Sequence, residues 1–210
     1  MKTKDKITNK ALELFNEFGT NAVSTNHIAK ALEISPGNLY YHFKNKEEII
    51  QELLKKMIEE YDNIFSDNNL DDESNILQQL IFDDIQISIK YKVIYNELSS
   101  LFKNDNQLKE IFIKNQKKRE VFLLGLFLKL QKNGYIYENI SEFVLKSVID
   151  TIWFLENFRF LRYELKEKNI DKVEDLNHQE ILLERLIPLY GFLTDKGKDF
   201  FNTHEILQNI

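Results

Sequence analysis

The stretch Ser24–Lys46 reads STNHIAKALEISPGNLYYHFKNK and predicts two short helices joined by a tight turn. Ser24 and Thr25 are both residue types that cap helix N-termini, so either of them can start the first helix. Ser35 is the next such residue. Pro36 follows it at the first helical position, where the missing proline N–H group does no harm. The stretch therefore has its own start signals for both helices.

Apolar residues predict which side of each helix is buried. The first helix, over about 26–32, and the second, over about 36–43, carry these residues at helical spacing: Ile28, Ala29 and Leu32, then Leu39 and Phe43. A longer amphipathic helix over about 4–18 precedes them, with Ile7, Ala11, Leu14, Phe15 and Phe18 on one stripe and Gly19 as its C-cap. We therefore expect a tri-helical helix-turn-helix unit at the N-terminus.

The rest of the chain predicts a larger helical body. Only 6 Gly and 2 Pro occur among 210 residues, which favours an all-α fold. Asn45 and Glu48 resemble a capping box for a fourth helix over about 46–65. Further helices are expected over about 74–90, 92–102, 105–132, 141–163 and 178–193, with a short one after residue 196. We expect two domains: the helix-turn-helix domain, or head, at 1–46, and a larger helical domain, or body, at 47–210.

Composition and charge narrow the class of protein. The chain has no cysteine, no apolar signal-peptide core at its N-terminus and no apolar run of membrane-spanning length, so we expect a soluble cytoplasmic protein. The formal net charge is −6, but residues 1–46 hold seven Lys against four acids and the remainder is acidic. The basic head is the part suited to a polyanion such as nucleic acid.

The residues from Thr25 to Lys46 follow the pattern T-x-x-I-A-x-x-L-x-I-S-x-G-x-L-Y-x-H-F-x-x-K. This pattern closely resembles the signature of the TetR family of bacterial transcriptional regulators. The resemblance implies a DNA-binding repressor rather than an enzyme, with no cofactor. It further implies a homodimer, paired through helices about 141–163 and 178–193, that binds a palindromic operator. A small, partly apolar effector would release such a dimer from double-stranded DNA.

The same resemblance assigns roles to side chains of this stretch. It implies that Pro36 opens the recognition helix and places Asn26, Gly37, Asn38 and Tyr40 near bases, and Thr25, Tyr41, His42 and Lys46 on phosphates. Glu33 departs from the pattern, because it stands where the family most often has glycine; a left-handed backbone there costs about 1 kcal/mol. The first 50 residues contain no Arg, so bidentate guanine recognition by Arg is excluded and an A/T-leaning operator is expected.

Other candidate sites in the body allow more than one interpretation. An effector pocket lined by aromatic residues is one interpretation, and a simple hydrophobic core is the other, for Phe82, Tyr91, Tyr95, Trp153, Phe154, Phe158 and Tyr163. The basic run KNQKKRE at 114–120 has three interpretations: a solvated helix face, a second nucleic-acid patch, or a site that attracts an anionic effector. The four His residues are scattered without ligand spacing, so no metal site is expected. Two other classes remain open: an enzyme in the body, and an adaptor whose helix-turn-helix no longer binds DNA.

Overall fold

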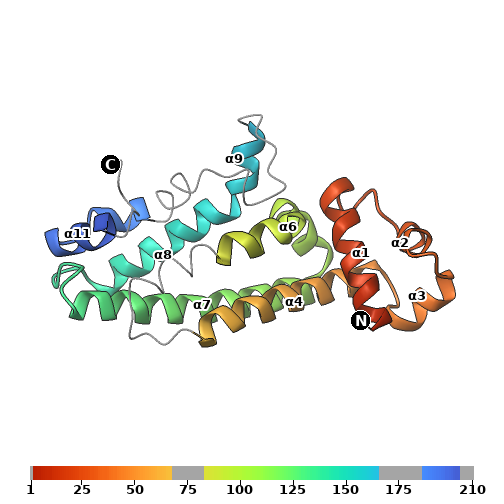
Figure 1. Ribbon diagram of the computed structural model, residues 1–210, viewed down its shortest axis with the longest axis horizontal. Coiled ribbons are helices and arrows are strands. Elements are labelled where there is room, and N and C mark those ends of the chain that lie inside the picture. Colours follow the sequence, from red (N-terminus) through yellow and green to blue (C-terminus); the bar gives the residue numbers. More distant parts are fainter. Residues whose placement is uncertain (1, 68–82, 166–185, 204–210) are drawn as a thin grey trace. The chain divides into compact units, whose positions relative to one another are not determined.

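The computed structural model describes residues 2–67, 83–165 and 186–203, and this part of the chain is built from helices (Figure 1). Labelled helices are α1 Thr3–Phe18, α2 Thr25–Ala31, α3 Pro36–His42, α4 Lys46–Asp67, α6 Lys92–Asn104, α7 Asn106–Lys132, α8 Glu142–Asn157, α9 Arg159–Leu165 and α11 Asp195–Thr203. Residues 83–90 and 186–190 are also helical. The only extended pairing in the described part is the isolated bridge between Ile136 and Leu193. The predicted all-α fold is confirmed.

The chain divides into two compact units. The first comprises Met1–Glu60 and Lys90–Ile113, and the second comprises Tyr61–Ile89 and Lys114–Ile210. The chain passes from one unit to the other three times, inside α4, near the end of the helical segment 83–90 and inside α7. The domain boundary expected after residue 46 stays a prediction.

The first unit is centred on α1, which is followed by the two short helices α2 and α3 (red to orange in Figure 1). The predicted stripe of α1 is buried at Ile7, Ala11 and Phe15, which expose 1% or less of their surface. Phe18 was expected on the same stripe but is 55% exposed. It is the last residue of α1, and the positive φ of Gly19 turns the chain immediately after it, which leaves about half of its side chain in solvent.

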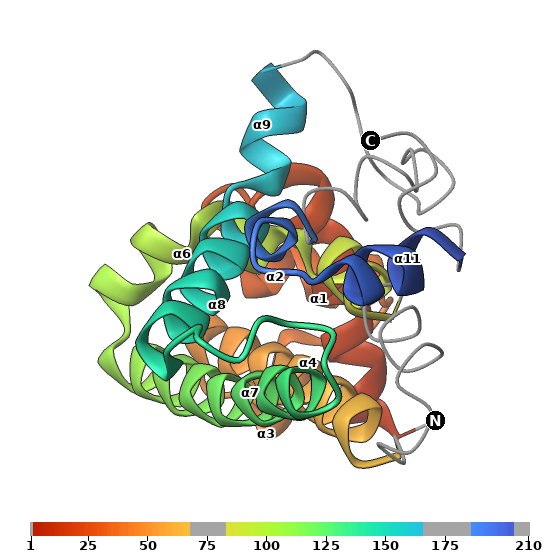
Figure 2. The same ribbon diagram turned by 90° about the vertical axis from the view of Figure 1, so that its left-hand side faces the viewer.

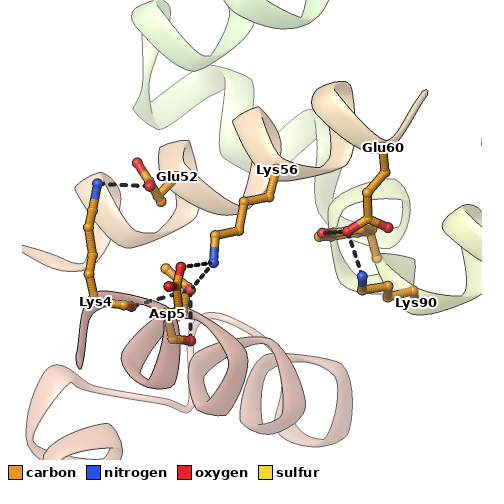
Figure 3. A network of polar contacts seen from close by, with 8 residues as sticks. Lys4, Asp5, Glu52, Lys56, Glu60 and Lys90 are labelled. Atoms are coloured by element: carbon orange, nitrogen blue, oxygen red, sulfur yellow. Dashed lines mark hydrogen bonds and ion pairs between the residues drawn. The ribbon is translucent and has the colours of Figure 1, made fainter. Parts of the chain in front are cut away.

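Ion pairs link α1 to α4, as Figure 3 shows. Lys4 contacts Glu52 at 2.8 Å, and Lys56 contacts the Asp5 carboxylate at 2.8 Å while also donating to the Thr8 hydroxyl at 2.8 Å. The Lys56 ammonium lowers the pKa of Asp5, first through its hydrogen bond and then through its charge. Their side chains are only partly buried, so these pairs orient α1 on α4 more than they stabilise the fold.

Glu60 makes a second set of polar contacts near the other end of α4 (Figure 3). Its carboxylate accepts from the Lys90 ammonium at 2.5 Å and from the Tyr91 hydroxyl at 2.7 Å. Burial, and then the hydrogen bond to Glu60, raise the pKa of Tyr91, so this hydroxyl stays a proton donor. Glu60 therefore ties the residues just before α6 to α4.

The second unit has a hydrophobic core formed by α7, α8 and the C-terminal segment. In both views α8 lies beside α7 (Figure 1, Figure 2). The buried members of this core are Leu126, Phe127, Leu130, Ile136, Leu145, Val148, Ile149, Ile152, Trp153, Leu186, Leu189, Leu193 and Phe201. Backbone bonds from Tyr137 to the Phe192 carbonyl (3.1 Å) and from Thr194 to the Tyr135 carbonyl (3.0 Å) hold the segment before α11 on the α7–α8 connection.

The helix expected over 141–163 is in fact two helices. α8 ends at Asn157, and Phe158 has the non-helical angles φ −100° and ψ 5°, after which α9 begins at Arg159. Arg159 is 2% exposed, and its guanidinium donates to the Ser88 hydroxyl at 3.0 Å. The change of direction at Phe158 brings this guanidinium into the interior, which the apolar pattern of the sequence does not predict.

Candidate nucleic-acid interface

The start of α2 is held by a capping box. The Ser24 hydroxyl accepts from the His27 backbone N–H at 3.2 Å, and the Ser24 N–H donates to His27 Nδ1 at 3.3 Å. Glu or Gln usually fills the second role, so a histidine here keeps a carboxylate away from the exposed start of α2. The sequence pattern led us to consider His27, one of the four scattered histidines, only as a metal ligand, and this capping role was not predicted. Its spacing of three residues from Ser24 was the available signal.

The turn between α2 and α3 is a Schellman motif. The Glu33 N–H donates to the Lys30 carbonyl at 3.1 Å, and the Ile34 N–H donates to the Ala29 carbonyl at 3.0 Å. Glu33 has φ 55°, the left-handed conformation that glycine adopts most easily, and it is the only non-glycine residue in the described part with positive φ. The turn therefore keeps the geometry expected of a glycine there, with a glutamate in its place.

The second helix begins at the predicted residue and buries the predicted side chains. Ser35 caps α3 by accepting from the Asn38 N–H at 3.2 Å, and Pro36 is the first helical residue. Leu39 and Phe43, at 0% and 3% exposure, anchor the inner side of α3. With those two side chains buried, the opposite side of α3 is presented to solvent.

The residues predicted to contact DNA lie mostly on that outer side. Tyr41 is 86% exposed and Tyr40 is 48% exposed. The other exposed members of the set are Asn26, Pro36, Gly37 and Asn38, and the half-buried ones are Thr25, His42 and Lys46. All nine positions belong to the first compact unit.

Two of these side chains contact each other across the helix pair. The Tyr40 hydroxyl and the Thr25 hydroxyl lie 3.0 Å apart, which joins the start of α2 to the middle of α3. The Tyr41 ring packs edge-on against His42, with ring centroids 5.1 Å apart. The structure thus brings one residue expected near bases together with one expected on a phosphate.

The cations of this surface are lysines. Lys44 is exposed, and its ammonium lies 3.9 Å from the Glu48 carboxylate. Lys46 is directed differently, because its ammonium donates to the Thr20 carbonyl at 2.5 Å. An ammonium has three donor hydrogens, so this bond leaves two for other acceptors.

The aromatic residues considered as a pocket are distributed over both units. Tyr91 and Tyr95 are buried in the first unit, and Trp153 and Tyr163 in the second. Phe154 and Phe158 are 60% and 49% exposed and pack on each other with ring centroids 4.8 Å apart. Phe82 lies outside the described residues. The pocket assignment stays a prediction.

The basic run at 114–120 is not a uniform cationic face. Lys118 contacts Asp62 at 2.7 Å. Arg119 is 6% exposed, and its guanidinium lies 2.9 Å from the Asp84 carboxylate and 3.6 Å from the Glu156 carboxylate. These contacts place the most strongly basic residue of the run inside the second unit.

Two classes of site are not found in the part of the chain that the structure describes. No group of His, Cys, Asp or Glu residues in that part is arranged to hold a metal ion. None of its helices combines the length and the apolar run needed to cross a bilayer.

Comparison with known proteins identifies relatives of the amino-terminal segment. The family described as "Bacterial regulatory proteins, tetR family" matches residues 7–53. The HTH-type transcriptional regulator QacR of Staphylococcus aureus is 54% identical over 54 residues, which cover 26% of this chain and 29% of that protein. The Biofilm operon icaADBC HTH-type negative transcriptional regulator IcaR of Staphylococcus epidermidis is 38% identical over 103 residues, covering 46% and 54%. The chain thus matches between about a third and about half of the length of these curated relatives.

Solved structures extend the likeness in fold to the whole chain. A TetR-family transcriptional regulator from Marinobacter aquaeolei VT8 has a TM-score of 0.85, with 24% identity and 98% coverage of both chains. A gamma-butyrolactone receptor described as ArpA-like has a TM-score of 0.71 at 14% identity, covering 98% of this chain and 96% of that one. At these identities the likeness concerns the fold alone.

Proposed function

We propose that this chain, whose residues 7–53 belong to the tetR family of bacterial regulatory proteins, is a cytoplasmic DNA-binding transcriptional repressor and not an enzyme. The observation that carries the proposal is the two-sided character of α3. Leu39 and Phe43 are buried, while the outer side presents an exposed run of small, amide and phenolic side chains. A short helix of this kind fits a major groove with its N-terminal residues toward the base edges. IcaR, similar over 103 residues, is a negative regulator, which supports repression over activation.

The proposed DNA contacts divide into two groups by chemistry. Near bases, the Asn26 and Asn38 amides can pair with an adenine edge, Gly37 lets the backbone approach closely, and the Tyr40 ring suits a thymine methyl group. On phosphates, the proposed donors are Thr25, Tyr41, His42 and Lys46. Pro36 opens the helix that carries most of them.

A second copy of the chain is part of this proposal, because one helix-turn-helix reads too few bases for specificity. Phe143, Phe154 and Phe158 are 79%, 60% and 49% exposed on α8 and at its C-cap. Their spacings of eleven and four residues place them on one stripe of the helix. Ile187 is 59% exposed as well. A two-fold partner that covers these side chains removes an apolar surface from water.

Release from DNA is proposed to follow from binding of a small, partly apolar effector to the helical body. Such a molecule changes operator affinity only if it prefers one of two conformations that differ in the spacing of the two recognition helices. α4 contributes residues to both compact units, so it is the element through which we expect the change to pass.

The test is selection of duplexes from a random pool by the purified protein. We expect enrichment of a palindromic sequence whose half-sites are centred about one helical turn, or a multiple of it, apart. Binding should weaken steeply with salt, since phosphate contacts displace counterions. A pool without any enriched sequence refutes the proposal and favours the adaptor reading of the helix-turn-helix.

A further inference from the structure

The connection between α1 and α2 is held from two sides through one buried residue, Thr20. Its backbone N–H donates to Glu97 Oε1 at 2.9 Å, and its hydroxyl donates to the other carboxylate oxygen of Glu97. Its carbonyl accepts from the Lys46 ammonium at 2.5 Å. We call Thr20, Glu97 and Lys46 the Thr20 cluster. It joins α6, the α1–α2 connection and the first residue of α4.

The connection is shaped around the Glu97 carboxylate. Gly19, the residue before Thr20, has φ 78°, and a Cβ placed there would lie 3.0 Å from Glu97 Oε1. A larger residue would therefore meet both a left-handed backbone and the carboxylate. Thr20 itself is 5% exposed, so its hydrogen bonds to the charged carboxylate are formed largely away from water, where they are strongest.

α1 and α6 are joined at a second place close by. The Asn16 side-chain amide donates to the Lys90 carbonyl at 2.8 Å, and its carbonyl oxygen accepts from the Val93 N–H at 3.1 Å. Tyr91, the N-cap residue of α6, makes no side-chain cap of its own. A residue of α1 therefore supplies the cap of α6, and the two helices are fastened at Asn16 and again at Thr20.

We propose that Glu97 is a positioning residue for DNA binding, although it lies outside the helix-turn-helix and is not itself a DNA contact. By holding Thr20, it sets the path of the chain into Ser24 and Thr25 at the start of α2. Through the carbonyl of the same residue, it also sets the position of the Lys46 ammonium. Movement of α6 away from α1 breaks these bonds, so operator affinity depends on where α6 lies. This inference rests on the proposed function.

The test compares matched variants on the duplex that the wild-type protein selects from the random pool. E97Q keeps the shape of the side chain but removes its charge, and T20V removes only the hydroxyl bond. Each should weaken operator binding roughly tenfold. E110Q, an exposed glutamate of α7 in the same compact unit, controls for the loss of one negative charge. T20S keeps the hydroxyl, and both controls should stay within about twofold of wild type.

Two further readouts separate positioning from a loss of folding. E97Q should lower the slope of log affinity against log salt by about one, because displacement of Thr20 moves the Lys46 ammonium, which is bonded to its carbonyl, away from the proposed phosphate contact. Hydrogen exchange of the peptide that spans Thr20 should become faster in E97Q and in T20V. Because the two residues bond to each other, the double variant should bind the operator only slightly more weakly than either single variant. If one variant does not fold, the exchange and affinity of the other decide the outcome.

The experiments distinguish a failure of the proposed function from a failure of the role assigned to Glu97. Wild-type protein that selects no duplex overturns the proposed function and this inference together. Wild-type protein that selects a duplex which E97Q and T20V bind as tightly as E110Q overturns only the role of Glu97. Unchanged hydrogen exchange at Thr20 in both variants also overturns only the role of Glu97, because it shows that the Glu97 carboxylate does not hold the α1–α2 connection.

Discussion

Replacing Glu33 by glycine should stabilise the protein. Glu33 has φ 55° at the position of the Schellman motif that glycine usually fills. Its side chain is exposed, and no described hydrogen bond or ion pair uses its carboxylate. Its backbone N–H bond to Lys30 is retained by any residue except proline. The substitution therefore removes strain without removing a described contact.

The size of the effect follows from two opposing terms. An L-residue in the left-handed region costs about 1–2 kcal/mol, which glycine recovers. Glycine also makes the unfolded chain more flexible, which costs about 0.4–1 kcal/mol. The net stabilisation then lies between about 0 and 1.6 kcal/mol, centred near 0.8 kcal/mol. For a chain of this length each kcal/mol raises Tm by roughly 2–4 °C.

Thermal unfolding followed by far-ultraviolet circular dichroism measures this difference directly. E33A is the matched control, because it removes the same charge and keeps the Cβ atom responsible for the strain. We expect E33G to raise Tm and E33A to leave it near the wild-type value, while both variants raise operator affinity slightly by removing a carboxylate from the turn. An equal rise in Tm for the two variants would show that charge, and not backbone strain, is what destabilises the turn.

Two more substitutions test other parts of the chain. In G197A, the added Cβ would collide with the Tyr135 carbonyl, so we expect a loss of about 1–3 kcal/mol in urea unfolding; G191A, with open space at its Cβ, should lose far less. In Y41A, operator affinity should fall roughly tenfold with Tm nearly unchanged, because the side chain is 86% exposed. Y137A, which also truncates an exposed tyrosine, should leave affinity unchanged, and a similar loss in both would refute a specific contact by Tyr41.

The helix-turn-helix was predictable because its determinants are local. Ser35 caps α3, Pro36 starts it, and Leu39 and Phe43 are buried, all as expected. Each of these signals acts over four residues or fewer, the range in which sequence spacing determines neighbours on a helix. The left-handed turn at Glu33 was predictable for the same reason, although glutamate itself does not favour it.

Contacts between distant residues were not predictable in this way. Glu97 binds Thr20 across 77 residues, and nothing in the spacing of either residue indicates the other. The role of His27 was local but was missed, because a histidine three residues after Ser24 is less familiar as a capping partner than a glutamate. The DNA contacts themselves stay predictions, since exposure indicates which side chains are free to bind and not what they bind.

The body shows why composition alone misjudges a charged run. Arg119 belongs to a stretch that reads as a solvated basic face, yet its guanidinium is buried against Asp84 and Glu156, on a ring face of Tyr61 4.3 Å away. A guanidinium buried this deeply requires both nearby carboxylates, and removing a partner of such a pair costs about 3–5 kcal/mol. An apolar stripe tolerates a small shift of one helix along another, whereas these directional contacts do not. These contacts therefore add to the hydrophobic core in specifying the positions of α7, α8 and the helical segment 83–90, through charged side chains that the sequence pattern assigns to the surface.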